Sequence, residues 1–191
     1  MRLFVTRHGE TEFNRQERIL GVTDIPLNDT GIRQARELAE RIRSLGGADI
    51  IISSPYLRTK MTSEPVAELC GAVTETEYRL REWDCGSYEG KDRFTGGYQE
   101  GKRIFAKRLG GGESLLQLAH RVYSALDDII DRYKGTDKTV LLVTHGGVCR
   151  VIETYFNDMT NEEYAGWFMG NCELREYFPG SDGGGLYDNR S

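Results

Sequence analysis

The chain has 191 residues, of which 38% are hydrophobic, and its formal net charge at pH 7 is -5. This size and composition suit one compact domain over residues 1–191. Acidic and basic residues are interspersed without a basic block that would indicate a nucleic-acid partner, and no segment reaches the roughly 18 apolar residues that a membrane span needs. We therefore expect a cytoplasmic protein that binds neither nucleic acid nor a membrane. Whether it forms a homodimer stays open.

The first half of the chain alternates between short apolar runs and helical patterns. Residues 3–6 form an apolar run that predicts a buried strand. Residues 31–45 place their apolar side chains on one helical face and stop at a glycine pair, which predicts a helix. A second buried strand is expected over 49–54. A helix is expected over 57–69, in which Pro65 introduces a kink or a break.

The second half repeats this alternation. Apolar residues at helical spacing predict a long helix over 113–134, and the apolar run 139–144 predicts a strand. A helix over 147–156 and a last strand near 172–178 follow. The tail over 180–191 is rich in glycine and polar residues, so we expect it to be loosely packed.

The alternation of continuous apolar strands with amphipathic helices predicts the fold class. We expect an α/β fold, a three-layer α/β/α sandwich around a mostly parallel sheet. Residues 81–112 do not fit the alternation, because they are rich in glycine and charge and show little periodicity. Long irregular segments of this kind are usually functional or disordered.

Two of the three histidines directly follow predicted strands, and each is followed by glycine. The first strand leads into Arg7 and His8, and the strand at 139–144 leads into His145. Arg58 lies just beyond the second strand. In an open α/β sheet, ligands bind at the carboxyl ends of the strands, so we expect these four side chains at one edge. His120 has no such partners and is assigned a structural role.

Two imidazoles and two guanidinium groups indicate phosphate chemistry. Arginine binds phosphate oxygens with two parallel hydrogen bonds, and a neutral imidazole is a nucleophile toward phosphorus. Nearby positive charges disfavour the imidazolium, so Arg7 and Arg58 should keep His8 neutral. No phosphate-binding glycine loop and no acidic metal-ligand set is present, and preorganised cationic donors can replace a metal ion. We therefore expect neither a metal nor a cofactor.

A leaving alkoxide needs a proton, and the candidate donor is Glu82 in the irregular segment. A bound phosphate dianion would favour the protonated form of a nearby carboxyl group. The residue pattern alone leaves Glu82 equally open to the interpretation of a surface loop carboxylate.

Six segments in order resemble those of the histidine phosphatase superfamily, which has the phosphoglycerate-mutase-like fold. The first resembles the signature R-H-G-E-T-x-x-N. The other five are similar to family stretches in the same order and at similar spacing. The six segments are TRHGETEFN, GVTDIPLNDTGIRQA, ISSPYLRTKMTSE, LREWDCGSYEG, GGGESLLQLAHRV and VLLVTHGGVCR.

The resemblance implies a role for each matching catalytic residue. His8 would be the nucleophile that forms a phosphohistidine. Arg7, Arg58 and His145 would complete the phosphate pocket. Glu82 would be the proton donor and then the base for the attacking water. The family needs no metal for this chemistry.

The resemblance also implies substrate-binding positions beyond Arg7 and Arg58. Asn14 would contact the phosphate. The backbone near Gly21 and Thr23 would approach the substrate, as would Gly146 after the second histidine.

Two departures from the mutase pattern favour a phosphatase. The segment between Glu82 and Glu113 is short beside that of the cofactor-dependent mutases, and Phe13 stands where those enzymes carry a tryptophan. The same segment holds four basic residues that either reach a second anionic group of the substrate or form an exposed basic helix face. They are Lys102, Arg103, Lys107 and Arg108.

The expected function is a metal-independent phosphomonoesterase that hydrolyses a small phosphorylated metabolite through a phosphohistidine. The alternatives are a cofactor-dependent phosphoglycerate mutase, a phosphoprotein phosphatase and a non-catalytic phosphate-binding module. The physiological substrate stays open.

The four cysteines form no C-x-x-C pair and are expected to be reduced thiols. Cys85 lies three residues from Glu82, so redox control is one interpretation of it. A packing thiol is the preferred interpretation.

Overall fold

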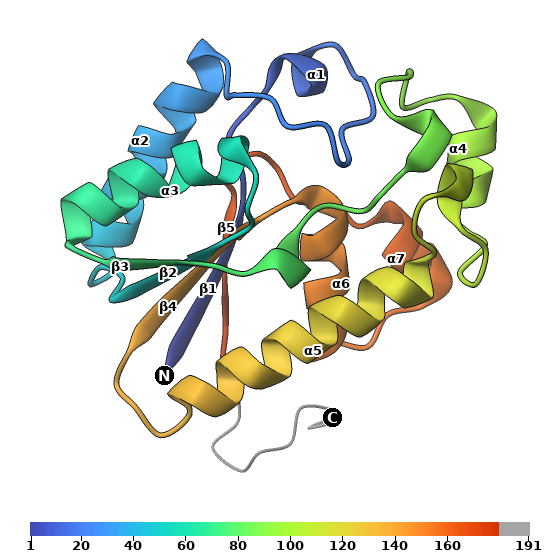
Figure 1. Ribbon diagram of the computed structural model, residues 1–191. Coiled ribbons are helices and arrows are strands. Elements are labelled where there is room, and N and C mark those ends of the chain that lie inside the picture. The colour runs from blue at the N-terminus through green and yellow to red at the C-terminus, as the bar shows by residue number, and fades with distance from the viewer. Residues whose placement is uncertain (180–191) are drawn as a thin grey trace.

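A computed structural model describes residues 1–179 of the chain (Figure 1). The tail expected to be loose over 180–191 lies outside the described residues.

A five-stranded sheet forms the centre of the fold, with the strand order β3-β2-β4-β1-β5. Four strands run parallel, and β5 pairs antiparallel with β1 at one edge. The expected mostly parallel sheet is therefore confirmed. The strands are β1 (Arg2–Arg7), β2 (Ile50–Ser53), β3 (Val73–Thr76), β4 (Thr139–Thr144) and β5 (Leu174–Tyr177).

Helices cover both faces of the sheet, as Figure 1 shows, and this confirms the three-layer sandwich. The helices α2 (Asp29–Ser44) and α3 (Leu57–Cys70) pack on one face. The helices α5 (Leu115–Tyr133) and α6 (Gly146–Phe156) pack on the other. Shorter helices lie in the connections: α1 (Glu12–Arg15), α4 (Gly96–Gly101), α7 (Asn161–Gly166) and the 3₁₀ turns Tyr78–Leu80, Gly86–Tyr88 and Leu109–Gly111.

The apolar run of β4 is explained by burial on both sides of the sheet. Val140 and Leu142 join the core beneath α5 and α6. Leu141 and Val143 join the core beneath α2 and α3. Successive side chains of a strand point to opposite faces, so a strand covered on both faces must be apolar at every position.

Two elements differ from the expectation. The edge strand β3 was not predicted, because its sequence VTET is short, polar and largely exposed. The helix α3 runs unbroken through Pro65. A proline in a helix removes one backbone hydrogen bond. Here the next residue, Val66, is fully buried against the α2 side of the core, and this packing holds the helix together.

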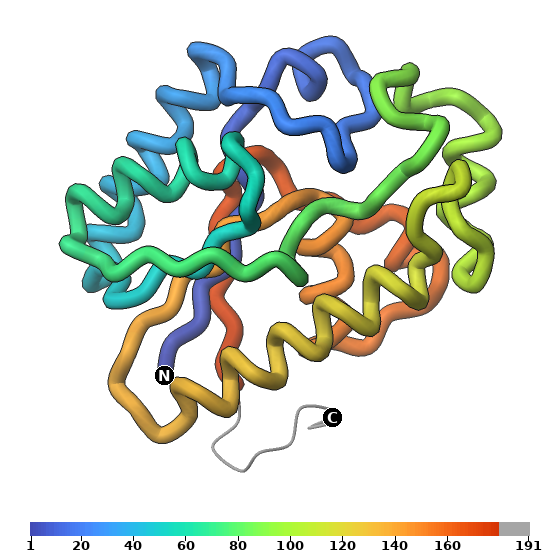
Figure 2. Tube along the Cα trace, viewed as in Figure 1, coloured from blue at the N-terminus to red at the C-terminus, as the bar shows by residue number. Residues whose placement is uncertain are grey.

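The register of the strands places the two histidines at the same edge. Arg7 of β1 lies opposite Thr144 of β4. The ladder continues one step further, because the His8 amide donates to the Thr144 carbonyl at 2.9 Å. His145 therefore leaves β4 beside the point where His8 leaves β1, at the end of the strands where the long loops gather (Figure 2).

Candidate active site

His8 lies directly after β1 and is only 3% exposed. Its Nδ1 lies 2.7 Å from the carbonyl oxygen of Gly9. A carbonyl can only accept, so Nδ1 carries the proton and Nε2 keeps a free lone pair. Burial lowers the pKa of His8 well below 6.5, and the positive charges of Arg58 and Arg7 lower it further. The ring is therefore neutral and nucleophilic at neutral pH.

The turn after His8 requires glycine. A Cβ on Gly9 would lie 2.6 Å from the backbone oxygen of Gly31 in the first turn of α2. Only a residue without a side chain allows this approach. The Gly9 amide is also held in place, because it donates a hydrogen bond to Thr62 Oγ1 at 3.0 Å. Contacts to α2 and α3 thus fix the backbone that carries His8.

His145 lies against His8, with their ring centroids 5.3 Å apart and the rings edge to face. Its Nδ1 accepts from Arg58 Nε at 3.2 Å, and its Nε2 lies 2.7 Å from Ser54 Oγ. Because Arg58 can only donate, the proton of neutral His145 sits on Nε2. Burial first, then Arg58 and His8, lower the pKa of His145 well below 6.5.

Arg58 extends from the first turn of α3 and is fully buried. Its Nη1 donates to the Thr23 carbonyl and its Nη2 to the Gly21 carbonyl, both at 2.8 Å. Its charge is balanced by no carboxylate within ion-pair distance among residues 1–179. Burial lowers the pKa of Arg58.

The backbone at Gly21 and Thr23 has partners that the sequence did not suggest. Their carbonyls hold Arg58, and their amides donate to the carboxylate of Glu89 at 2.8 and 3.1 Å. Neither residue lines the cavity described below. In this structure both position Arg58, and their approach to substrate stays a prediction.

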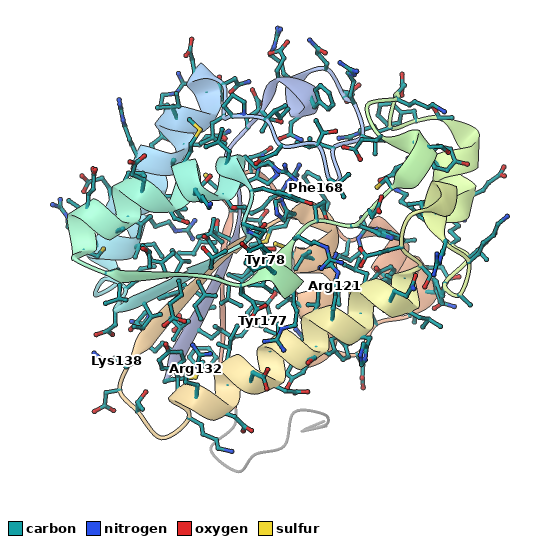
Figure 3. All side chains as sticks on the ribbon, in the orientation of Figure 1. Tyr78, Arg121, Arg132, Lys138, Phe168 and Tyr177 are labelled. Atoms are coloured by element: carbon teal, nitrogen blue, oxygen red, sulfur yellow. The ribbon has the colours of Figure 1, made fainter. Side chains whose placement is uncertain are left out.

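Arg7 ends β1 directly before His8. Its Nη1 donates to the Met169 carbonyl at 3.0 Å, and its guanidinium stacks on Phe168 at 5.3 Å. Figure 3 labels Phe168 near the loops at this end of the sheet. Arg7 Nε is buried and has no hydrogen-bond partner among the described residues. A buried donor without a partner marks a place for a ligand acceptor.

Glu82 enters the site from the loop after the 3₁₀ turn Tyr78–Leu80 and is 9% exposed. Its Oε1 accepts from the Trp83 amide at 2.8 Å, and its Oε2 accepts from the Gly147 amide in the first turn of α6 at 3.1 Å. These bonds hold the carboxyl group in place, and Glu82 lines the same cavity as His8. Glu82 is therefore not a surface loop carboxylate.

Asn14 forms a capping box with Thr11 at the start of α1. Its Oδ1 accepts from the Thr11 backbone and side chain at 3.1 and 3.0 Å. With its oxygen occupied, its amide nitrogen is left to donate to a ligand.

A cavity of about 430 Å³ joins these residues. Among the expected site residues, Arg7, His8, Asn14, Glu82 and Gly146 line it. Arg58 and His145 do not line it but lie behind His8, since Arg58 bonds to His145 and the His145 ring contacts the His8 ring. The cavity therefore opens onto the nucleophilic nitrogen, a free arginine donor and a carboxyl group.

Several residues of the site were not found from the sequence. Arg150 lies on α6, which begins directly after His145, and its place on a helix that starts at the site was an available signal. The segment around Trp167 and Phe168 lines the cavity but shows no periodicity that would have indicated it.

The remaining candidates separate clearly in the structure. His120 is exposed on α5, outside the site. Lys102 lines the cavity, whereas Lys107 and Arg108 are exposed away from it. Cys85 is buried, and burial raises the pKa of its thiol far above its ordinary value. A buried, protonated thiol is unreactive, which favours the packing role.

A profile of the histidine phosphatase superfamily, branch 1, matches residues 3–186. This chain belongs to the histidine phosphatase superfamily. The resemblance seen in the six motifs is thereby confirmed.

Relatives with assigned names include mutases and phosphatases of this superfamily. The probable phosphoglycerate mutase GpmB of Salmonella typhi is 39% identical over 153 residues, which cover 76% of this chain and 70% of the relative.

Solved structures of the superfamily confirm the phosphoglycerate-mutase-like fold. Phosphoserine phosphatase from Entamoeba histolytica, in complex with 3-phosphoglyceric acid, has a TM-score of 0.79 and 27% identity, covering 93% of this chain and 90% of that one. A mycobacterial glucosyl-3-phosphoglycerate phosphatase has a TM-score of 0.80 and 25% identity, covering 92% and 88%.

Two further findings concern residues 1–179. None of the helices there combines the length and the hydrophobicity that crossing a bilayer requires. The same residues contain no group of three or more His, Cys, Asp or Glu side chains arranged to hold a metal ion.

Proposed function

We propose that this superfamily member is a phosphomonoesterase that hydrolyses a small phosphorylated metabolite through a phosphohistidine on His8, without a metal ion. One observation carries the proposal: His8, whose Nε2 is free, lines one cavity together with Glu82 and with Arg7, whose Nε has no partner among the described residues. The cavity volume of about 430 Å³ lies in the range of small-molecule sites and favours a metabolite over a phosphoprotein.

In the first step, Nε2 of His8 attacks phosphorus, and the bond from phosphorus to the leaving oxygen breaks. Arg7 and the Gly146 amide end of α6 stabilise the charge on the phosphoryl oxygens. Glu82 in its protonated form gives its proton to the leaving oxygen, so the product leaves as an alcohol.

In the second step, water attacks the phosphohistidine. Glu82, now a carboxylate, accepts a proton from this water, and the nitrogen–phosphorus bond breaks. Inorganic phosphate leaves and His8 returns to its neutral form with its proton on Nδ1. Each step needs only groups that line the cavity or lie directly behind it.

Replacement of the nucleophile tests this proposal. His8→Ala should lower kcat for 4-nitrophenyl phosphate at least about 1,000-fold and abolish acid-labile labelling by a ³²P-substrate. The exposed His120→Ala is the matched control and should keep wild-type turnover and labelling. Turnover by a folded His8→Ala protein would reject the covalent mechanism. A wild type that is inactive on every phosphate ester would favour a binding module.

A mutase is the second candidate, because the relative at 39% identity bears that name. A mutase returns the phosphoryl group to the substrate, and a phosphatase gives it to water. We therefore compare phosphate release with isomerisation of 3-phosphoglycerate, with and without a bisphosphate primer. Phosphate release should exceed isomerisation, and primer-dependent isomerisation in excess of release would favour the mutase.

A further inference from the structure

The cavity carries more positive charge than one phosphate requires. Beyond Arg7, its wall contains Arg93 and Lys102 from the irregular segment and Arg150 from α6. None of these three takes part in an ion pair among the described residues. The ion pairs among residues 1–179 are all formed by residues that do not line this cavity. The same wall carries two carboxylates, Glu17 and Glu82, and five cationic side chains including Arg18, so positive charge is in excess here.

Lys102 and Arg150 stand at the junction of two cavities. A second cavity of about 340 Å³ lies between the α4 and α7 segments, which Figure 2 shows on the same side of the molecule. Lys102 and Arg150 line both cavities. A ligand that extends from His8 into the second cavity would therefore come close to both a lysine and an arginine.

Both side chains are held in place while their charged ends keep free donors. Arg150 Nε donates to the Trp167 carbonyl at 3.1 Å, and its guanidinium faces the ring of Tyr164 at 5.3 Å. Lys102 Nζ lies 4.8 Å from the ring centre of Tyr98. Within residues 1–179, no hydrogen bond engages Lys102 Nζ or the two Nη atoms of Arg150. Positioned cations with free donors are what recognition of an anion needs.

The surroundings of Lys102 destabilise its charged form. Burial lowers its pKa to about 8, and the like charge of Arg150 is the next largest cause. Arg93 and Arg103 from its own segment act in the same direction. An anion placed between Lys102 and Arg150 would relieve this repulsion, and a neutral group would not.

We infer that the leaving group of the substrate carries a second anionic group, a carboxylate or a phosphate, which Lys102 and Arg150 bind where the two cavities meet. This inference rests on the proposed function, since it takes the phosphoryl group that reacts to be the one at His8. The second cavity receives whatever the leaving group carries beyond that anion.

Matched substrates test the inference. The probes are ω-carboxyalkyl phosphates of increasing chain length, each paired with the ω-hydroxyalkyl phosphate of the same length. Alkanediyl bisphosphates form a parallel arm that separates a second phosphate from a carboxylate. At the best length, kcat/KM for the anionic member should exceed that for the neutral member by about 10-fold or more. Lys102→Met and Arg150→Met should each bring this ratio close to one.

Two matched controls come from the same chain. Lys107→Met and Arg108→Met remove exposed basic residues outside both cavities and should leave the ratio unchanged. If Arg150→Met fails to fold, Lys102→Met together with Arg150→Lys provides the test, since the lysine keeps a charge but loses the second donor. Equal kcat/KM for anionic and neutral members at every length would overturn the inference, as would a ratio that survives in the folded Lys102 and Arg150 variants.

The pH dependence gives a second readout. Since kcat/KM reports the free enzyme, the preference for the anionic member should decline as pH rises through about 8, where Lys102 loses its proton. Lys102→Met should lack this decline, and a decline that persists in Lys102→Met would count against the assignment. Turnover of 4-nitrophenyl phosphate that depends on His8 reports the proposed function separately, so failure of one is distinguishable from failure of the other.

Discussion

At the scale of single residues, three effects act together on His8. The Gly9 carbonyl fixes the proton on Nδ1, burial removes water that would stabilise the imidazolium, and two guanidinium groups repel a positive charge. In the proposed function, the same guanidinium groups would attract the phosphate dianion. One cluster would then both bind the substrate and keep the attacking nitrogen unprotonated.

The depressed pKa of His8 can be observed directly. For a base, a lowered pKa means that the neutral form persists to lower pH, so His8 should still be neutral at pH 6.5. In an NMR titration of the free protein, the His8 Cε1–H resonance should keep its neutral shift through this range and move only in more acidic solution. The chain has three histidines, so His8→Ala assigns the signal. A midpoint at or above 6.5 would contradict the geometry.

Arg58 shows where inference from single residues ends. The family resemblance implied a phosphate contact, and the structure gives its three nitrogens to Gly21, Thr23 and His145. Direct contact with phosphate stays a prediction for this residue. In the present geometry, the buried charge of Arg58 lowers the pKa of both His8 and His145.

At the scale of elements, the helix α5 clamps the loop that carries Glu82. Arg121 of α5 donates to the carbonyls of Arg81 and Glu82 at 2.7 and 3.1 Å and forms two bonds of 2.8 Å with the Glu113 carboxylate. The Glu113 backbone in turn accepts from the Trp83 side chain at 2.9 Å. Figure 3 labels Arg121 on α5. This network makes Arg121 a positioning residue for Glu82, the proposed proton donor.

Weakening of the clamp should affect substrates according to their leaving group. Arg121→Lys keeps the charge but loses the two-pronged contact with Glu113. We expect kcat to fall about 10- to 100-fold for an alkyl phosphate, whose leaving oxygen needs a proton, and only a few-fold for 4-nitrophenyl phosphate. Steady-state kinetics on the two substrates measure the difference.

The matched control for the clamp is Arg132→Lys, the same change on the exposed last turn of α5, where Arg132 pairs with Glu75. It should leave both substrates unaffected. Equal losses on both substrates in Arg121→Lys would mean that Arg121 serves stability alone.

The helices and strands differ in how well the sequence predicts them. β1, β4, α2 and α5 are long or strongly periodic, and they lie close to their predicted ranges. β3, α1, α4 and α7 span only four to six residues each and were not predicted. Such short elements gain little from local propensity, and contacts from distant residues decide whether they form.

At the scale of the whole molecule, the distribution of charge matters more than its sum. The chain is acidic overall, with a net charge of -5, yet the cavity wall is basic. The fold concentrates a minority of its arginines at one end of the sheet, where the low dielectric strengthens their effect. These fixed cations can supply the charge stabilisation that phosphoryl transfer requires.

A chelator should therefore leave the protein unaffected. After exhaustive treatment with EDTA, we expect unchanged kcat/KM for 4-nitrophenyl phosphate and an unchanged melting temperature. Arginine donors remain in place when metal ions are removed, and so does the nucleophile. Loss of activity that added magnesium or manganese restores would contradict the proposal. Arg7→Met should lower kcat about 100-fold in the same assay, which shows that the assay detects loss of a donor.

The sequence by itself determined the sandwich and the meeting of His8 with His145, because apolar strands must be buried and parallel strands bring their carboxyl ends to one edge. Only the tertiary structure decided which groups face the cavity and which stand behind it. It brought Glu82 onto the first turn of α6, turned Gly21 and Thr23 toward Arg58, and set Lys102 beside Arg150. The physical reason is that these contacts join irregular segments far apart along the chain. Such segments have no periodicity to predict, and their positions follow from packing and hydrogen bonding after the sheet has formed.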